Sequence, residues 1–150
     1  MDKIDRNLLS ALHEDAKTTV KALSERVGLS QPSCAERIKR LIDQGVIEKF
    51  SIQVSPKAIG FPIAAIVRVR PLPGELSRVE QVIREIDEVV QCDKVTGDDA
   101  FFCRLYLRDI DALDPCLGKL APYATTSTSI VKSTQIANRL LPLEDPARTH

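Results

Sequence analysis

The chain has 150 residues, 43% of them hydrophobic, which is enough to form the core of one domain or of two small ones and argues against a disordered protein. Its 21 basic residues equal its 21 acidic ones, so the formal net charge is +0, and any affinity for nucleic acid must come from a local patch or from several copies acting together. The chain starts without the pattern of a secretion signal, and no apolar run approaches the roughly 20 residues of a membrane span. We therefore expect a cytoplasmic protein with no membrane contact.

Residues that commonly carry metals or catalysis are sparse. No CxxC pair occurs, and the only histidines are His13 and His150. We therefore expect no metal site and no cofactor. With two histidines, catalysis based on histidine is disfavoured. Cysteine often behaves as a small core hydrophobe, so buried reduced thiols are favoured over a redox sensor. The scattered cysteines are Cys34, Cys92, Cys103 and Cys116.

A first helix is predicted at the start of the chain, where the side chain of Asp2 can cap it. We expect this helix to cover the two that follow. Its apolar face is expected to hold Ile4, Leu8 and Leu12, which recur at helical spacing. The residues expected to point outward are Asp5, Arg6 and Glu14.

The stretch from Val20 to Ile47 carries the pattern of a helix-turn-helix. Thr18 or Thr19 can start the first of its two short helices. Apolar residues at helical spacing define one face of each helix. These are Leu23 and Val27 in the first helix, and Cys34, Ile38 and Leu41 in the second.

The corner between these helices is specified by four signals within five residues. Gly28 can adopt a positive φ and end the first helix, and Leu29 can fill the corner. Ser30 can cap the second helix through its hydroxyl. Pro32 then fits the first turn, where its missing N–H breaks no hydrogen bond. This order is harder to obtain by chance than a few basic residues on a helix.

The outward face of the second helix is polar, and its predicted DNA-contacting residues are Gln31, Ser33, Arg37, Lys39 and Arg40. Arginine can make a bidentate contact to guanine in the major groove, serine near a helix start can bond a base or a phosphate, and lysine can bind phosphates. A charged outer face is also normal for any surface helix. The corner favours the DNA-reading interpretation over this alternative.

A wing and a linker are predicted after Gly45, which is expected to end the third helix in a left-handed conformation. The alternation from Val46 to Val54 predicts a strand. Ser55 and Pro56 break it, residues 57–59 fit one helical turn, and Gly60 closes that turn. We therefore assign residues 1–50 to a winged helix-turn-helix domain and residues 51–61 to a linker strand and turn.

The rest of the chain follows the order βαββαβ. Strands are predicted at 63–69, 89–96, 101–108 and about 125–134. The first helix, 75–87, is expected to turn Leu76, Val79, Ile83 and Ile86 inward, and the second aligns Ile110, Leu113, Leu117 and Leu120. Short connections and right-handed crossovers make this a four-stranded antiparallel sheet with both helices on one face, a ferredoxin-like sandwich. The fold class is therefore α+β, with this domain at residues 62–135 and a C-terminal tail at 136–150.

The face of the sheet that carries no helix mixes apolar, aromatic and arginine side chains. Its expected members are Ala64, Ile66, Arg68, Arg70, Phe102, Arg104, Tyr106 and Arg108. Such a mixture is typical of partner-binding surfaces, although a merely amphipathic solvent face is the alternative. We favour self-association through this face.

The chain resembles the Lrp/AsnC family of bacterial and archaeal transcription regulators, also called feast/famine regulators. The resemblance rests on the IDRNLLSAL start, the VGLSQPSCAERIKRLIDQGVIEKF segment, Ala58-Ile59-Gly60 and the Val95-Thr96-Gly97 turn. It implies a domain that binds double-stranded DNA and an effector domain that dimerises through its sheet and assembles into tetramers or octamers. It also implies a small effector, typically an amino acid, bound between dimers near the turn joining the second and third strands.

The effector residues predicted from this resemblance are Thr96, Gly97, Asp98, Asp99, Ala100 and Thr126. Gly97 lets a ligand approach the backbone N–H groups, and Asp98 or Asp99 can accept a hydrogen bond from an ammonium. An ordinary Gly-Asp hairpin turn needs no ligand at all, and the residues alone favour that alternative. The family resemblance favours an effector-binding turn instead.

The chain departs from the family pattern at three positions. Ser24 replaces a common alanine, and Cys34 replaces a branched aliphatic residue. In the effector turn the family commonly has Gly, two residues, then Asp and an aromatic, whereas here Ala100 precedes Phe101.

Three other functions compete with a regulator. A siroheme decarboxylase-like enzyme would need histidines, and the effector domain has none before His150. A hydrolase built on Asp98 and Asp99 would need two carboxylates converging on one bond, but adjacent turn residues diverge. A ligand-sensing oligomer without DNA binding is disfavoured by the intact recognition face. We therefore expect no enzyme activity.

Overall fold

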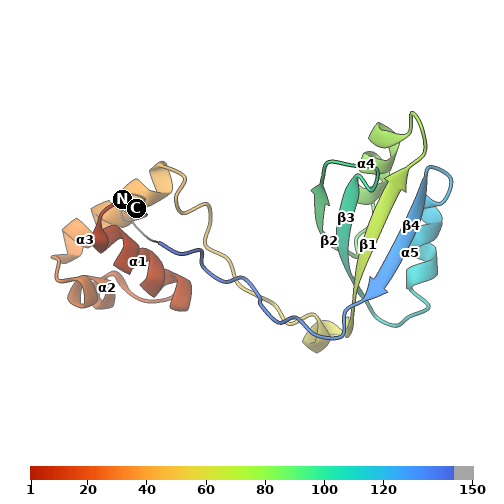
Figure 1. Ribbon diagram of the computed structural model, residues 1–150. Helices are drawn as coiled ribbons and strands as arrows, with labels where there is room; N and C mark the ends of the chain where they lie inside the picture. Colours follow the sequence, from red (N-terminus) through yellow and green to blue (C-terminus); the bar gives the residue numbers. More distant parts are fainter. Residues whose placement is uncertain (144–150) are drawn as a thin grey trace. The chain divides into compact units, whose positions relative to one another are not determined.

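The computed structural model describes residues 1–143 and divides into two compact units (Figure 1). One unit comprises Met1–Gln53 with the described part of Ile136–His150, and the other is Val54–Gln135. The end of the predicted tail, residues 144–150 with His150, lies outside the described residues. None of the helices found in residues 1–143 is long and apolar enough to cross a membrane.

The N-terminal unit contains three helices, α1 (Lys3–Glu14), α2 (Val20–Val27) and α3 (Gln31–Asp43). The side chains of Asp2 and Thr19 cap the first two, as predicted. The three helices enclose a small apolar core. Its buried members are Leu8, Ala11, Leu23 and Cys34, and Ile4, Leu12, Val27, Leu29 and Ile38 pack against them. The predicted apolar faces of the three helices are therefore confirmed.

The predicted strand over residues 46–54 is wrong, because no residue of this segment is in a strand. Gly45 does adopt the predicted left-handed conformation, with φ of 70°, and the N–H groups of Val46 and Ile47 both donate to the carbonyl of Leu41. Beyond this point the chain is extended and Ile52 is 78% exposed. A strand needs a neighbouring strand for its backbone hydrogen bonds, and none lies beside this segment within the described chain.

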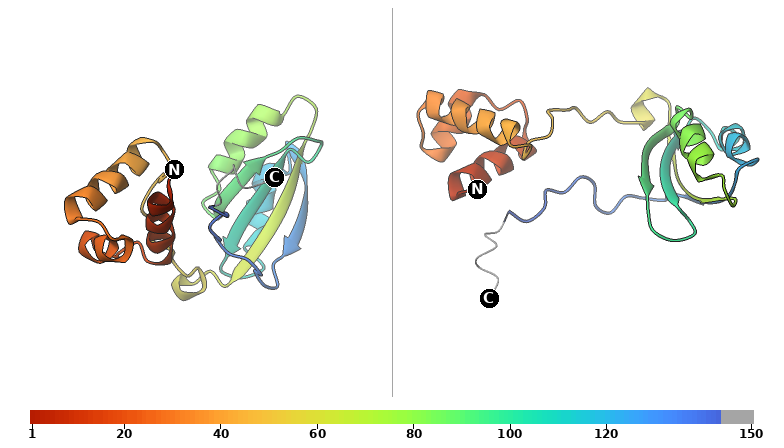
Figure 2. Two further views of the ribbon diagram at one scale, coloured as in Figure 1. Left: turned by 60° about the vertical axis from the view of Figure 1, so that its left-hand side comes forward. Right: turned by 90° about the horizontal axis from the view of Figure 1, so that it is seen from above.

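The second unit begins with the predicted single turn, η1 (Lys57–Ile59), closed by Gly60 at φ 91°. Its sandwich elements are β1 (Ile63–Pro71), α4 (Leu76–Arg84), β2 (Val89–Lys94), β3 (Phe101–Leu107), α5 (Leu113–Leu120) and β4 (Ala124–Ile130). The strands pair antiparallel in the order β2-β3-β1-β4, and both helices cover one face of the sheet (Figure 2). The ferredoxin-like βαββαβ sandwich is therefore confirmed.

The core of this unit lies between the helices and one face of the sheet. It contains Val79, Val82 and Ile83 of α4, Cys116 and Leu120 of α5, and the buried side chains of β1 and β3. Strand register separates the two faces, because directly opposed residues share a face. Ala64, Ile66 and Arg68 pair with Tyr106, Arg104 and Phe102, which places these six residues together on the uncovered face, as predicted.

Several details of the predicted elements are wrong. α4 ends at Arg84 and β2 at Lys94, before the predicted ends at 87 and 96. Ile110 lies before α5 and is exposed, because the carboxylate of Asp109 accepts the N–H of Ala112 and forms a turn there. Leu76 starts α4 but is exposed. β4 ends at Ile130, which pairs with Ala65, because its partner strand β1 starts close by and offers no further ladder.

Candidate DNA-binding face and effector turn

The corner of the helix-turn-helix has the predicted geometry. Gly28 lies at φ 71°, and its N–H and that of Leu29 both donate to the carbonyl of Ser24. The hydroxyl of Ser30 accepts the N–H of Ser33 at 3.3 Å, and Pro32 lies in the first turn of α3. These local bonds fix the start of α3 relative to α2.

The polar side chains on the outward face of α3 fall into two groups. Gln31, Ser33 and Lys39 are exposed, and Lys39 reaches Asp43 one turn later at 3.0 Å. Arg37 and Arg40 instead turn toward α1, where their side chains remain 25% and 48% exposed. The predicted contact set therefore lies on one helix, but Arg37 and Arg40 are held by carboxylates of the α1 region.

These carboxylates belong to Asp2 and Asp5. Asp5 was expected to point outward, and this is wrong, because the residue is only 3% exposed. Its carboxylate accepts Arg37 Nη1 at 2.9 Å, Arg40 Nη2 at 3.0 Å and the N–H of Asp2 at 3.2 Å. Burial of a carboxylate is costly unless it is paired with a positive charge and hydrogen-bonded. The two arginines provide both for Asp5.

Asp2 completes this cluster. Its carboxylate accepts the N–H of Asp5 at 2.9 Å and Arg37 Nη1 at 2.6 Å. The hydrogen bond from the Asp5 backbone, followed by that from Arg37, lowers the pKa of Asp2 from 3.8 to about 2. We name Asp2, Asp5, Arg37 and Arg40 the α1–α3 clamp. One signal in the sequence could have revealed it, since Asp2 and Asp5 have the three-residue spacing of a capping box.

The predicted effector turn joins β2 to β3 and is closed by the N–H of Val95, which donates to the carbonyl of Ala100 at 2.8 Å. Thr96, Gly97 and Asp98 are exposed together at its tip, with Gly97 at φ 106°. Ala100 is buried in the core of the sandwich, so its side chain is not available to a ligand. The tip of the turn therefore presents its polar groups to solvent, whereas Ala100 does not.

Asp99 points away from this tip toward β1. It accepts Arg70 Nε at 3.1 Å and lies 3.8 Å from Arg68 Nη1, while Arg68 Nη2 donates to Ser127 of β4 at 3.1 Å. A shallow hollow over these groups is bordered by Arg68, Arg70, Asp99 and residues 125–127, so Thr126 lies at its edge. The predicted effector residues thus fall into two places, the tip and this arginine cluster. The role of the two arginines was missed, because their pairing with Asp99 depends on the sheet register.

Within residues 1–143, no three or more His, Cys, Asp or Glu side chains are grouped so that they could hold a metal ion.

A helix-turn-helix unit joined to a separate α+β sandwich defines the class of two-domain, DNA-binding regulators. Residues 1–48 match the model of a winged helix-turn-helix DNA-binding domain, and residues 64–141 match that of the Lrp/AsnC ligand-binding domain. The chain therefore belongs to the Lrp/AsnC family of transcription regulators.

Individual relatives agree with this assignment. The transcriptional regulator LrpC of Bacillus subtilis is 26% identical over 133 residues, which cover 89% of this chain and 92% of LrpC. A transcriptional regulator of Neisseria meningitidis, solved as a complex with L-methionine, is 26% identical with a TM-score of 0.86, covering 95% of this chain and 97% of that one. The feast or famine regulatory protein of Mycobacterium tuberculosis, also complexed with L-methionine, is 28% identical with a TM-score of 0.85, covering 93% and 97%.

Replacing Asp2 with Asn tests the clamp, because asparagine can still cap α1 but gives Arg37 no negative charge. Since folding lowers the pKa of Asp2, its charge stabilises the folded protein above the ordinary pKa of 3.8, and this contribution is lost as pH falls to about 2. We expect wild type to melt at a higher temperature than Asp2→Asn near neutral pH, and this difference to vanish at the acidic end. Thermal unfolding followed by circular dichroism across this pH range measures it.

Glu25→Gln serves as the control, because Glu25 is exposed on α2 and makes no ion pair within residues 1–143. A melting difference for Asp2→Asn that stayed constant with pH, or that Glu25→Gln reproduced, would contradict the clamp.

Proposed function

We propose that α3 is the DNA-recognition helix and that Gln31, Ser33, Lys39 and Arg40 face the duplex. Gln31 and Ser33 lie in its first turn, the end that recognition helices direct toward base edges. Lys39 is exposed for a phosphate contact, and Arg40 uses one nitrogen on Asp5, which leaves further guanidinium N–H groups for DNA. The exposed polar face of a helix that the clamp holds in place is the observation that carries this proposal.

Arg37 has a different role in this proposal. Its guanidinium is the least exposed of the predicted contacts and binds both Asp2 and Asp5. We therefore propose that Arg37 positions α3 against α1 and does not read bases itself.

We further propose that the exposed tip of the β2–β3 turn binds an amino acid. Near Gly97, backbone N–H groups can receive the ligand's carboxylate, since no side chain blocks the approach. Asp98 is exposed and can accept hydrogen bonds from its ammonium, whereas the charge of Asp99 is met by Arg68 and Arg70. Methionine is the first candidate, because two relatives have been solved as complexes with L-methionine.

Assembly through the uncovered sheet face is part of the same proposal. Phe102 and Ile66 are accessible there beside Arg68 and Arg104, a composition typical of interfaces. A dimer would present two recognition helices, which can enter successive major grooves about 34 Å apart. Several dimers on one DNA molecule, as tetramers or octamers, would add avidity despite the absence of net charge.

We infer that the chain is a regulator without enzyme activity and acts in the cytoplasm, where its DNA target is located. Asp98 and Asp99 diverge, since Asp99 is engaged by two arginines and Asp98 faces solvent. Residues 54–135 contain no histidine, which disfavours a siroheme decarboxylase-like reaction.

The DNA proposal is tested by selecting fragmented genomic DNA of the source organism on the purified protein and sequencing what is retained. We expect a small set of enriched fragments. On one such fragment, Lys39→Ala should weaken binding and reduce the slope of log affinity against log salt by about 1 for each recognition helix in contact. Lys119→Ala, an exposed lysine of α5, should leave the slope unchanged. Retention of no fragment at low salt would favour the ligand-sensing module without DNA binding.

The effector proposal is tested by thermal-shift screening of the amino acids. A ligand present at about 100 times its Kd stabilises the folded protein by about 2.7 kcal/mol, which is a rise of several degrees in melting temperature. Asp98→Asn should abolish that rise, whereas Asp111→Asn, an exposed loop aspartate, should retain it. No response of wild type to any amino acid would leave the turn a structural hairpin.

The assembly proposal is tested by analytical ultracentrifugation. We expect wild type to sediment as a dimer or larger species at micromolar concentration. Phe102→Asp should shift it to monomer, because it replaces an accessible aromatic side chain of the proposed interface with a charge that assembly would have to bury. Ile110→Asp introduces the same charge at an exposed apolar residue outside the sheet and should not. A monomeric wild type would refute the assembly.

A further inference from the structure

Two cysteines face each other across neighbouring strands. Cys92 of β2 is directly opposite Cys103 of β3, and their Sγ atoms are 3.4 Å apart. Cys103 is only 2% exposed, whereas Cys92 lies on an edge strand and is exposed. One member of the pair can therefore be reached from solvent while the other stands behind it.

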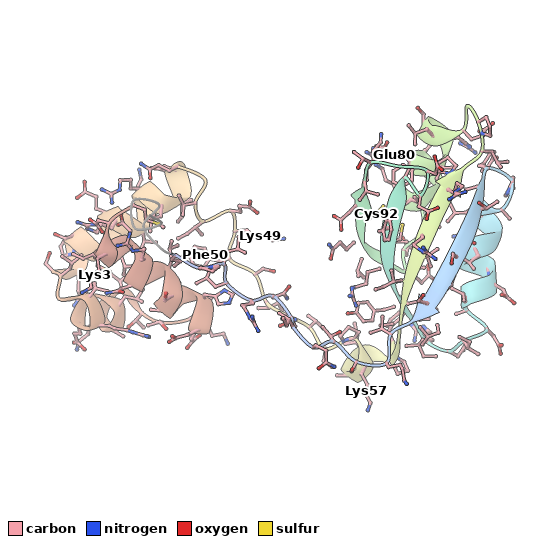
Figure 3. All side chains as sticks on the ribbon, viewed as in Figure 1. Lys3, Lys49, Phe50, Lys57, Glu80 and Cys92 are labelled. Carbon is pink, nitrogen blue, oxygen red and sulfur yellow. The ribbon has the colours of Figure 1, made fainter. Side chains whose placement is uncertain are left out.

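The expectation of buried thiols holds for Cys34, Cys103 and Cys116 but is wrong for Cys92. A small hollow beside Cys92 is lined by Glu80, Ile83, Arg84, Lys94 and Phe101. Glu80 of α4 accepts Arg84 Nη2 at 2.6 Å and Lys94 Nζ at 3.2 Å, so these long side chains are held together at its rim (Figure 3 labels Glu80 and Cys92). A reagent of the size of a peroxide has an approach to the Cys92 sulfur.

We propose that Cys92 and Cys103 are an oxidisable dithiol that a hydroperoxide converts into a disulfide linking β2 to β3. The sulfurs must approach by roughly 1.4 Å to reach a bond length of about 2.05 Å. Directly opposed residues of antiparallel strands have Cβ atoms about 4.5 to 5.5 Å apart, close to the separation that a disulfide spans. Side-chain rotation with a small shift of the edge strand is therefore sufficient.

The reaction balances with one equivalent of hydrogen peroxide. The Cys92 thiol releases its proton, and the thiolate attacks one peroxide oxygen. The O–O bond breaks and the departing hydroxide takes up that proton, so the products are a Cys92 sulfenic acid and one water. Cys103 then attacks the Cys92 sulfur, and the sulfenic oxygen leaves with protons as a second water. Two thiols lose two electrons and two protons in total, and the peroxide is reduced to two molecules of water.

Burial raises the pKa of both thiols, which keeps them protonated near neutral pH. Because the thiolate is the reactive form, the pair is expected to react slowly and to respond to sustained exposure. The exposed Cys92 is the attacking residue, since Cys103 has no comparable access.

The link would lie at the base of the turn proposed to bind the effector. β2 ends at Lys94 and β3 begins at Phe101; Cys92 lies two residues before Lys94, and Cys103 lies two residues after Phe101. Drawing the two strands together there would alter the spacing of the Thr96–Asp98 tip. This consequence rests on the proposed effector site, whereas formation of the disulfide does not.

The test exposes the reduced full-length protein to excess hydrogen peroxide, blocks the remaining thiols in denaturant and digests with trypsin. Trypsin cuts after Lys94 and Arg104, so the disulfide would join peptides 85–94 and 95–104. We expect that linked pair by mass spectrometry, a fall from four free thiols per chain to two, and recovery of all four with dithiothreitol. Cys116→Ser should still form the link, and Cys103→Ser should leave Cys92 to oxidise to sulfinic acid.

Wild type that yields Cys92 sulfinic acid without the linked peptides, or a Cys92 disulfide between two chains, would overturn the proposal. The amino-acid thermal shift of the linked protein is measured separately against that of the reduced protein. We expect it to be reduced at least several-fold, and an unchanged shift would overturn the effect on the turn. Absence of any shift in the reduced protein counts against the proposed effector site alone, because the linked peptides are detected without a ligand.

Discussion

The buried carboxylate of Asp5 is the interaction on which the DNA-binding unit depends. The apolar core of this unit is small, with few fully buried side chains shared by three helices, and such a core leaves the rotation of α3 weakly fixed. Asp5 accepts hydrogen bonds from two arginines one turn apart on α3, so both the rotation and the height of α3 against α1 are defined. The polar residues beside those arginines can then be presented as a rigid set.

The same arginines illustrate a conflict between structure and recognition. An arginine that neutralises a buried carboxylate cannot leave it without exposing an unpaired charge in the interior, which is costly. Arg37, held by two carboxylates, is the more committed of the two, and Arg40 is half exposed with one nitrogen engaged. We therefore expect direct base contacts from the neighbours of Arg37 and not from Arg37 itself. Arg40 can both pair with Asp5 and contact DNA.

The sequence predicts features that depend on neighbouring residues, but not those that depend on partners far away along the chain. Gly28, Ser30 and Pro32 act within one turn of their own position, so the helix corner followed from the residues. The order βαββαβ followed from periodicity, and strand register then fixed the uncovered face. Burial of Asp5 depends on arginines more than 30 residues away, and the segment 46–54 has the alternation of a strand but no neighbour to pair with.

The candidate effector site was predictable only in part, for a related reason. Glycine and two aspartates in a turn indicate an accessible hairpin, and Gly97 and Asp98 are found at its tip. Which aspartate remains available is decided by β1, since Arg70 and Arg68 reach Asp99 from a strand that lies 29 or more residues earlier in the chain. The resemblance indicated this turn as the candidate site, but it could not distribute roles between two neighbouring carboxylates.

These contacts also define how an event at the turn could reach the uncovered face. Arg68 pairs in register with Phe102 on that face and lies against Asp99 at the end of the turn. A ligand or a disulfide that displaced Asp99 would release Arg70 into the surface proposed for self-association and would leave Arg68 with its hydrogen bond to Ser127. A ligand shifts assembly only if its affinities for the assembled and the unassembled protein differ. The arginine pair, which borders both the turn and the uncovered face, is a physical source for such a difference. Because coupling is reciprocal, assembly through that face would in turn change the affinity of the turn for its ligand.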